Sequence, residues 1–250
     1  MTSALEPFDY NDGDVTCKGR LALPPGDDLR PGVVVFHDIQ GVGEHPIGKA
    51  TRLAEEFGYL ALAADVYGNG QPPEMSGADR VVASWLSRPD DLVRRASAAV
   101  EALKAHPRCN GRIGAIGFCF GGATVLALVR SGLSGLQAAV SFHGVLGTAK
   151  QAVVGQAHPK TLVLHGADDP FAGDVPFLDM AGVVHSKTLP DFLEEMSNAN
   201  VDCQVVAYAG VVHAFTIPNA GDFGVVGAKY DELADKRSWE SMGALFREAL

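Results

Sequence analysis

The chain has 250 residues, of which 47% are hydrophobic and 20% are charged, and its formal net charge is −10. This length and apolar content suit one sheet flanked by helices, so we expect a single domain over residues 1–250. The negative charge, with no Lys/Arg-rich cluster, argues against nucleic acid or an anionic membrane surface as a partner. No apolar run approaches the ~18 residues needed to cross a bilayer.

The four cysteines, Cys17, Cys109, Cys119 and Cys203, show neither paired spacing nor a C-x-x-C motif, and no secretory leader precedes Pro7. This usage is typical of free thiols in a reducing compartment. We therefore expect a cytoplasmic protein.

Strand-like and helix-like segments alternate along the chain without internal repeats, which is typical of βαβ units and a mainly parallel sheet. Apolar runs predict strands at 32–36, 59–65, 112–116, 138–142 and 161–165, and alternation of apolar and polar residues predicts a strand at 201–208. Helical periodicity predicts helices at 46–57, from Pro89 to before Pro107, at 123–130 and at 230–250. In the last helix, the expected buried stripe consists of Leu233, Trp239, Met242, Leu245 and Phe246.

A Gly-rich turn lies between the predicted strand 112–116 and the predicted helix 123–130. It reads Gly117-Phe118-Cys119-Phe120-Gly121-Gly122, which is a nucleophile elbow with Cys119 where the usual pattern has serine. Glycine at the flanking positions lets the backbones pass without a clash. The unpaired N–H groups at the helix N-terminus favour negative charge on the sulfur, so we interpret Cys119 as a nucleophile.

A thiol that performs acyl transfer needs a histidine to accept its proton and an acid to orient that histidine. The predicted strand 161–165 ends in a loop with Asp168 and Asp169, and the loop after the next strand carries His213. This is the order expected in such a sheet. We favour Asp169, which matches a Gly-x-x-Asp loop, and keep Asp168 as the alternative.

The oxyanion of an acyl-transfer intermediate requires two backbone N–H donors. Phe120, directly after the nucleophile, supplies the first donor. The Gly-rich loop after the predicted strand 32–36 supplies the second, for which Ile39 is the candidate. The neighbouring Asp38 either modulates thiol ionisation or braces this loop, and both interpretations stay open.

Two further loops follow strands at the same edge and are expected to shape the pocket, at 66–75 and 216–223. Tyr67, Ile217 and Phe223 line a mostly apolar pocket if they turn inward, and otherwise anchor their loops by packing. His143 and Gly144 trail the predicted strand 138–142 at this edge, where we expect His143 to support packing rather than to perform chemistry.

Taken together, these motifs resemble the dienelactone hydrolase family. The resemblance runs from His37-Asp38-Ile39 through the elbow and Gly166-Ala167-Asp168-Asp169 to His213-Ala214-Phe215. It implies an α/β-hydrolase fold, with a mainly parallel central sheet and helices on both faces. It also implies a triad of Cys119, Asp169 and His213.

The resemblance also points to two departures from the family pattern. Asp38 stands where the family has a glutamate that pairs with the thiol until substrate displaces it, and aspartate is one methylene shorter. Asn69 and Ile217 stand where the founding enzymes hold the substrate carboxylate with arginines. An anionic dienelactone would lose two charge-assisted contacts here.

We therefore expect a hydrolase that cleaves a small-molecule ester or lactone through an acyl-cysteine, without a cofactor, as a monomer or homodimer. We do not expect Cys119, Asp169 and His213 to bind a metal, because acyl transfer explains their order more simply. The alternative is a catalytically silent protein that uses the same pocket to bind a ligand.

Overall fold

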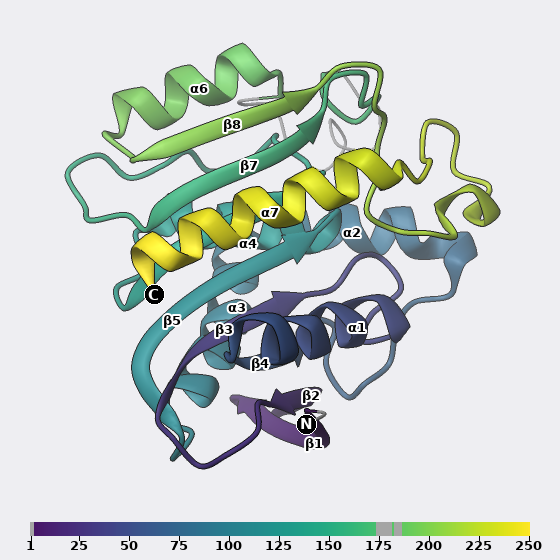
Figure 1. Cartoon of the computed structure of the whole chain (residues 1–250). Coiled ribbons are helices and arrows are strands. Elements are labelled where there is room, and N and C mark those ends of the chain that lie inside the picture. Colours follow the sequence, from purple (N-terminus) through teal and green to yellow (C-terminus); the bar gives the residue numbers. More distant parts are fainter. Residues whose placement is uncertain (1–2, 174–181, 183–186) are drawn as a thin grey trace.

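The computed structural model describes residues 3–173, 182 and 187–250. Its strands form one eight-stranded sheet in the order β1-β2-β4-β3-β5-β6-β7-β8 (Figure 1). Strands β3 to β8 are mutually parallel, and β2 runs antiparallel to both of its neighbours, β1 and β4. The strands are β1 (Ala4–Asp12), β2 (Val15–Leu23), β3 (Arg30–Phe36), β4 (Leu60–Ala64), β5 (Cys109–Phe118), β6 (Leu136–Phe142), β7 (Lys160–Gly166) and β8 (Cys203–Tyr208).

Helices cover both faces of the sheet. One buried cluster joins the sheet to α1 and α7, and a second joins the opposite face to α2, α3, α4 and α6 (Figure 1). The helices are α1 (Glu44–Arg52), α2 (Ala78–Leu86), α3 (Pro89–Lys104), α4 (Phe120–Ser131), α6 (Leu189–Asn198) and α7 (Glu232–Ala249). This arrangement confirms the predicted α/β-hydrolase fold.

The predicted strands coincide with β3 to β8. The central strands β3 to β7 are largely buried on both faces and read as apolar runs, whereas the edge strand β8 is half-exposed and alternates. The predicted helix 46–57 begins two residues earlier as α1 and continues as a wider π-helical turn, Leu53–Phe57. Gly58 ends it with φ 70°, a left-handed conformation that glycine adopts without strain.

Several elements and one buried position were not predicted. The hairpin of β1 and β2 and the helices α2 and α6 were missed, although Thr188 and Asp191 form a capping box that marks the start of α6. The prediction that Leu233 is buried was wrong, since it is 54% exposed and Ala234 is buried instead. The Asp231 side chain accepts a hydrogen bond from the Ala234 N–H at 2.8 Å, and this cap sets the rotation of the first turn of α7.

A buried ion pair fixes α4, the helix that follows Cys119. Arg130 on α4 donates to Glu195 on α6 through Nε at 2.8 Å and Nη2 at 2.9 Å. The same guanidinium donates to the carbonyl oxygen of Leu146 at 2.7 Å. The far end of α4 is therefore held by a bidentate contact in the protein interior.

Candidate active site

Cys119 lies between the end of β5 and the first residue of α4, with φ 53° and ψ −113°. The turn needs glycine on both sides because the backbones approach closely. A Cβ on Gly117 would lie 2.0 Å from the Gly121 carbonyl oxygen, and a Cβ on Gly121 would lie 2.1 Å from that of Phe36. The turn leaves Cys119 partly exposed at the wall of a cavity. The structure thus has the strand-turn-helix context that the sequence predicts.

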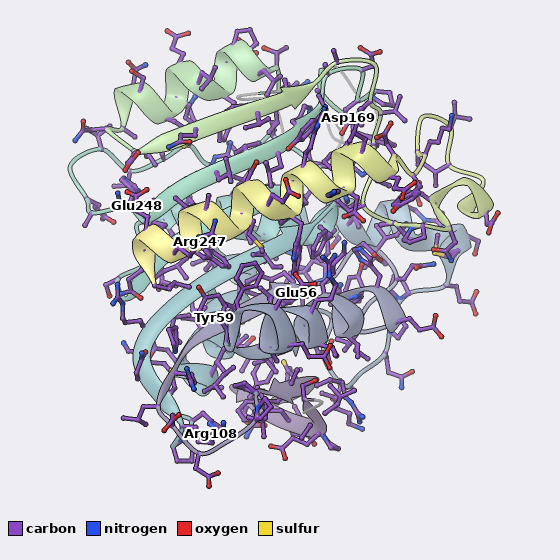
Figure 2. All side chains as sticks on the ribbon, in the orientation of Figure 1. Glu56, Tyr59, Arg108, Asp169, Arg247 and Glu248 are labelled. Atoms are coloured by element: carbon purple, nitrogen blue, oxygen red, sulfur yellow. The ribbon has the colours of Figure 1, made fainter. Side chains whose placement is uncertain are left out.

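His213 and Asp169 lie in the loops that follow β8 and β7. The Nδ1 atom of His213 lies 2.8 Å from Asp169 Oδ2, and both side chains are buried (Figure 2 labels Asp169 near the ends of these strands). The other carboxylate oxygen, Oδ1, accepts a hydrogen bond from the Phe171 N–H at 2.9 Å. The alternative acid, Asp168, is exposed. Of the two aspartates, Asp169 is the one against the histidine.

The surroundings of His213 favour its charged form. Burial lowers the pKa of His213, but negative charge on Cys119 and Asp169, with hydrogen bonds to both, outweighs burial and raises that pKa to about 10. Since Nδ1 faces Asp169, Nε2 is the nitrogen left for Cys119. The raised pKa therefore suits His213 to accept and hold a proton beside Cys119.

The loop with Ile39 is clamped by His37. The Val66 N–H donates to His37 Nε2 at 3.1 Å, so the ring proton is on Nδ1, which donates to the Asp38 carbonyl oxygen at 2.6 Å. Burial lowers the pKa of His37, in keeping with a neutral ring. The Tyr67 hydroxyl donates to the carbonyl oxygen of Ile39 at 3.1 Å. These contacts fix the peptide of Ile39 in the cavity wall that also contains Cys119.

Phe120, the other expected oxyanion donor, begins α4 and lines the same cavity. The first N–H groups of a helix have no partner within the helix, so they are suited to bind an anion. Ile39 and Phe120 therefore both border the space in front of the Cys119 sulfur.

Asp38 also lines the cavity, and its side chain is buried. Its Oδ1 atom accepts a hydrogen bond from the Gln40 N–H at 2.8 Å, which braces the loop. Its Oδ2 atom lies 3.4 Å from His45 Nδ1. The structure thus shows the bracing contact, and the effect of Asp38 on the thiol stays a prediction.

The cavity in front of Cys119 has a volume of about 530 Å³. Its lining is mostly apolar, and the acidic side chains in it are Asp38 and Asp79; the described lining contains neither Lys nor Arg. Its apolar lining residues include Ile39, Met75, Val82, Val145, Phe171 and Ile217.

The predicted pocket residues are only partly brought together. Ile217 lines the cavity as expected. Tyr67 follows the packing alternative, since its ring stacks on Phe120 with centroids 5.6 Å apart. Asn69, also a candidate pocket residue, is exposed and does not line this cavity. The side chain of Phe223 lies outside the described part of the structure.

Lining residues from α2 and from the short helical turn before it were not predicted from the sequence. Met75 and Val82 are examples. Their signal was the apolar face of α2, which is indistinguishable in sequence from an ordinary core face.

All four cysteines are free thiols. Among the residues that the structure describes, no three His, Cys, Asp or Glu side chains are grouped so that they could hold a metal ion. None of the described helices combines the length and the apolar character required to cross a membrane.

Comparison with known proteins places this geometry in a family. A model of the dienelactone hydrolase family matches residues 17–250. The structure is similar to a crystal structure of a dienelactone hydrolase-like promiscuous phosphotriesterase from metagenomic libraries, with 37% identity, a TM-score of 0.89, and coverage of 100% of this chain and 99% of the other.

Curated relatives agree with this placement. A protein of a Bradyrhizobium species named "probable 2-oxo-3-(5-oxofuran-2-ylidene)propanoate lactonase" is 26% identical, over 86% of this chain and 85% of its own. The carboxymethylenebutenolidase of Pseudomonas putida is 28% identical, over 60% of this chain and 66% of its own. The chain therefore belongs to the dienelactone hydrolase family and is a hydrolase of the carboxylic ester and lactone class.

Proposed function

We propose that the protein cleaves its ester or lactone bond by nucleophilic catalysis through Cys119, His213 and Asp169. The observation that carries this proposal is the contact of 2.8 Å between His213 Nδ1 and Asp169 Oδ2 beside a cysteine at a strand-helix turn. Asp169 orients the ring so that Nε2 is available to the thiol.

In the first half of the reaction, His213 takes the thiol proton and the Cys119 sulfur attacks the carbonyl carbon. The tetrahedral oxyanion accepts hydrogen bonds from the N–H groups of Phe120 and Ile39. The carbon–oxygen bond then breaks, and His213 gives its proton to the departing alkoxide oxygen. The products of this half are an acyl-cysteine thioester and the alcohol, which stays attached if the substrate is a lactone.

In the second half, His213 takes a proton from water as the water oxygen attacks the thioester carbon. The collapse of the second tetrahedral intermediate breaks the carbon–sulfur bond, and the proton on His213 returns to the sulfur. The acid is released and the Cys119 thiol is restored.

The cavity lining supports an uncharged substrate. Asp38 and Asp79 repel a carboxylate, and no Lys or Arg of the described lining offsets them. Ile217 lines the cavity at a position where, by the family resemblance, the founding enzymes hold the substrate carboxylate with an arginine. We therefore propose neutral esters or lactones in preference to lactones that bear a carboxylate.

Steady-state hydrolysis of an aryl acetate, an aryl butyrate, a neutral lactone and a dienelactone by the wild type and Cys119→Ala tests this function. We expect the wild type to turn over the neutral substrates and Cys119→Ala to lose this turnover. The matched control Cys109→Ala, which removes another free thiol, should retain it. Acid quenching during turnover should trap an added acyl mass on the peptide that contains Cys119. Equal background rates in the wild type and Cys119→Ala would instead support the ligand-binding alternative.

A second candidate activity is hydrolysis of neutral phosphotriesters. The solved structure with 37% identity is described as a promiscuous phosphotriesterase, and the mostly apolar lining of the cavity here suits an uncharged triester. An aryl dialkyl phosphate added to the same panel tests this activity. Release of the aryl alcohol that is lost in Cys119→Ala would support it, and rates equal to the buffer control would exclude it.

A further inference from the structure

His143 is a buried histidine that the proposed mechanism does not use. It follows β6 directly, with φ 39°, a left-handed conformation that is unusual for a residue with a side chain. Its ring lies edge-on to the rings of His213 and Phe215, with centroid distances of 5.2 and 5.1 Å. It thus occupies the space between the nucleophile turn and the loop that carries the base.

Both ring nitrogens of His143 are engaged by these two segments. The Cys119 N–H donates to Nδ1 at 3.2 Å, in addition to the carbonyl oxygen of Phe142 at 3.1 Å. An amide N–H can only donate, so Nδ1 must carry a lone pair and the ring proton must be on Nε2. That Nε2–H donates to Thr216 Oγ1, which lies 2.8 Å away.

The ring is held neutral by its surroundings. Burial lowers the pKa of His143 well below its usual range. Positive charge on the neighbouring basic side chains lowers it further, and these are His213, His45, Lys49 and His165. A neutral ring keeps Nδ1 as an acceptor and adds no positive charge beside His213. The bridge therefore stays intact while the proton moves on and off His213.

We propose that His143 is a positioning residue that couples the Cys119 turn to the loop of His213 through Thr216. The inference rests on the proposed function. Thr216 lies three residues after His213, and its side chain is completely buried. Because one neutral ring spans both segments, it sets the separation between the Cys119 sulfur and His213 Nε2, which proton transfer requires to be short.

Two variants remove the bridge at different points. His143→Phe keeps a ring of similar shape but loses both hydrogen bonds, and Thr216→Val keeps the shape of the side chain but loses the acceptor. Each should lower kcat by about 10- to 100-fold while KM changes by less than about twofold, because the reacting groups move rather than the cavity wall. The effects of the two substitutions should be less than additive in the double variant, since either one breaks the same bridge.

A matched control is Thr161→Val. Thr161 is also buried, its hydroxyl donates to the Pro159 carbonyl oxygen at 2.9 Å, and it lies at the opposite end of the parallel strands. We expect wild-type kcat and KM in this variant, which separates a lost bridge from a lost buried hydroxyl.

A second readout does not depend on turnover. The rate of Cys119 alkylation by iodoacetamide, followed on the Cys119 peptide by mass spectrometry, reports the thiolate at each pH. In His143→Phe and Thr216→Val the rate near pH 6 should fall about tenfold, and the profile should move toward that of an unassisted thiol. Thr161→Val should retain the wild-type profile.

The outcomes separate the two proposals. Wild-type alkylation profiles and kcat in folded Thr216→Val would overturn the positioning role of His143, and this variant decides alone if His143→Phe does not fold. Shifted alkylation profiles without Cys119-dependent turnover in the wild type would support the bridge and refute the catalytic function.

Discussion

The close approach at Gly121 gives a prediction with a defined magnitude. In Gly121→Ala, the new Cβ would lie 2.1 Å from the Phe36 carbonyl oxygen and 2.6 Å from that of His37, whereas ordinary Cβ contacts lie at 3.4–4 Å. Both partners are backbone atoms, so no side-chain rotation relieves the overlap. The end of β3 must shift by about 1 Å, and overpacking of this kind costs about 2 kcal/mol.

This displacement has two measurable effects. For a domain of this size, about 2 kcal/mol lowers Tm by about 4–8 °C. Because His37 leads into the loop of Ile39, the proposed oxyanion donor moves as well, and a shift of about 1 Å costs on the order of 100-fold in kcat. Differential scanning calorimetry and steady-state hydrolysis of an aryl acetate measure the two effects.

Gly48→Ala is the matched control. Gly48 is exposed within α1, and no atom lies within 4 Å of its added Cβ. The substitution should raise stability by about 1 kcal/mol through helix propensity and leave kcat unchanged. If Gly121→Ala had the Tm and kcat of the wild type, the argument from backbone contact would be refuted.

Three further predictions concern charge. Asp169→Asn should lower kcat by about a thousandfold, whereas Asp168→Asn should change it by less than about twofold; equal effects in the same assay would exclude the assigned acid. Because the pKa of His213 is raised from 6.5 to about 10, its contribution to stability is complete below pH 6.5 and is lost as the pH rises toward 10. Urea unfolding should show this loss in the wild type and less of it in Cys119→Ala, and identical pH dependence in both would contradict the coupling. Glu195→Gln leaves a buried guanidinium without its counter-charge and should lower the free energy of unfolding by about 3 kcal/mol, which a change below about 1 kcal/mol would disprove.

Features that depend on neighbouring residues were predictable from the sequence. The turn around Cys119 is encoded by its flanking glycines, and the order of the loops with Asp169 and His213 follows from alternation of strands and helices. The buried face of α3 is local in the same way, since its five apolar positions follow the helical period and all are buried: Leu92, Ala96, Ala99, Val100 and Leu103.

Features that depend on contacts between distant segments were not predictable from the sequence. The sequence left open whether Tyr67 lines the cavity or anchors its loop, because the hydrogen bond from its hydroxyl to the Ile39 carbonyl oxygen is a contact that no local pattern encodes. Leu233 was expected in the core, but the cap on α7 turns it to solvent. The role of His143 could not be inferred either, because it requires knowing which N–H group meets each ring nitrogen.

By itself, the sequence determined the class of fold, the Gly-flanked turn of Cys119, and the order in which the loops of Asp169 and His213 follow it, because these depend on backbone preference and hydrophobic period within short segments. Only the tertiary structure decided that Asp169 rather than Asp168 meets His213, that the cavity is apolar and without Lys or Arg in its described lining, and that His143 bridges two loops. The physical reason is that the parallel register of β5 to β8 brings distant loops to one edge of the sheet. There, differences of a few tenths of an ångström in the donor–acceptor distance decide which groups form hydrogen bonds.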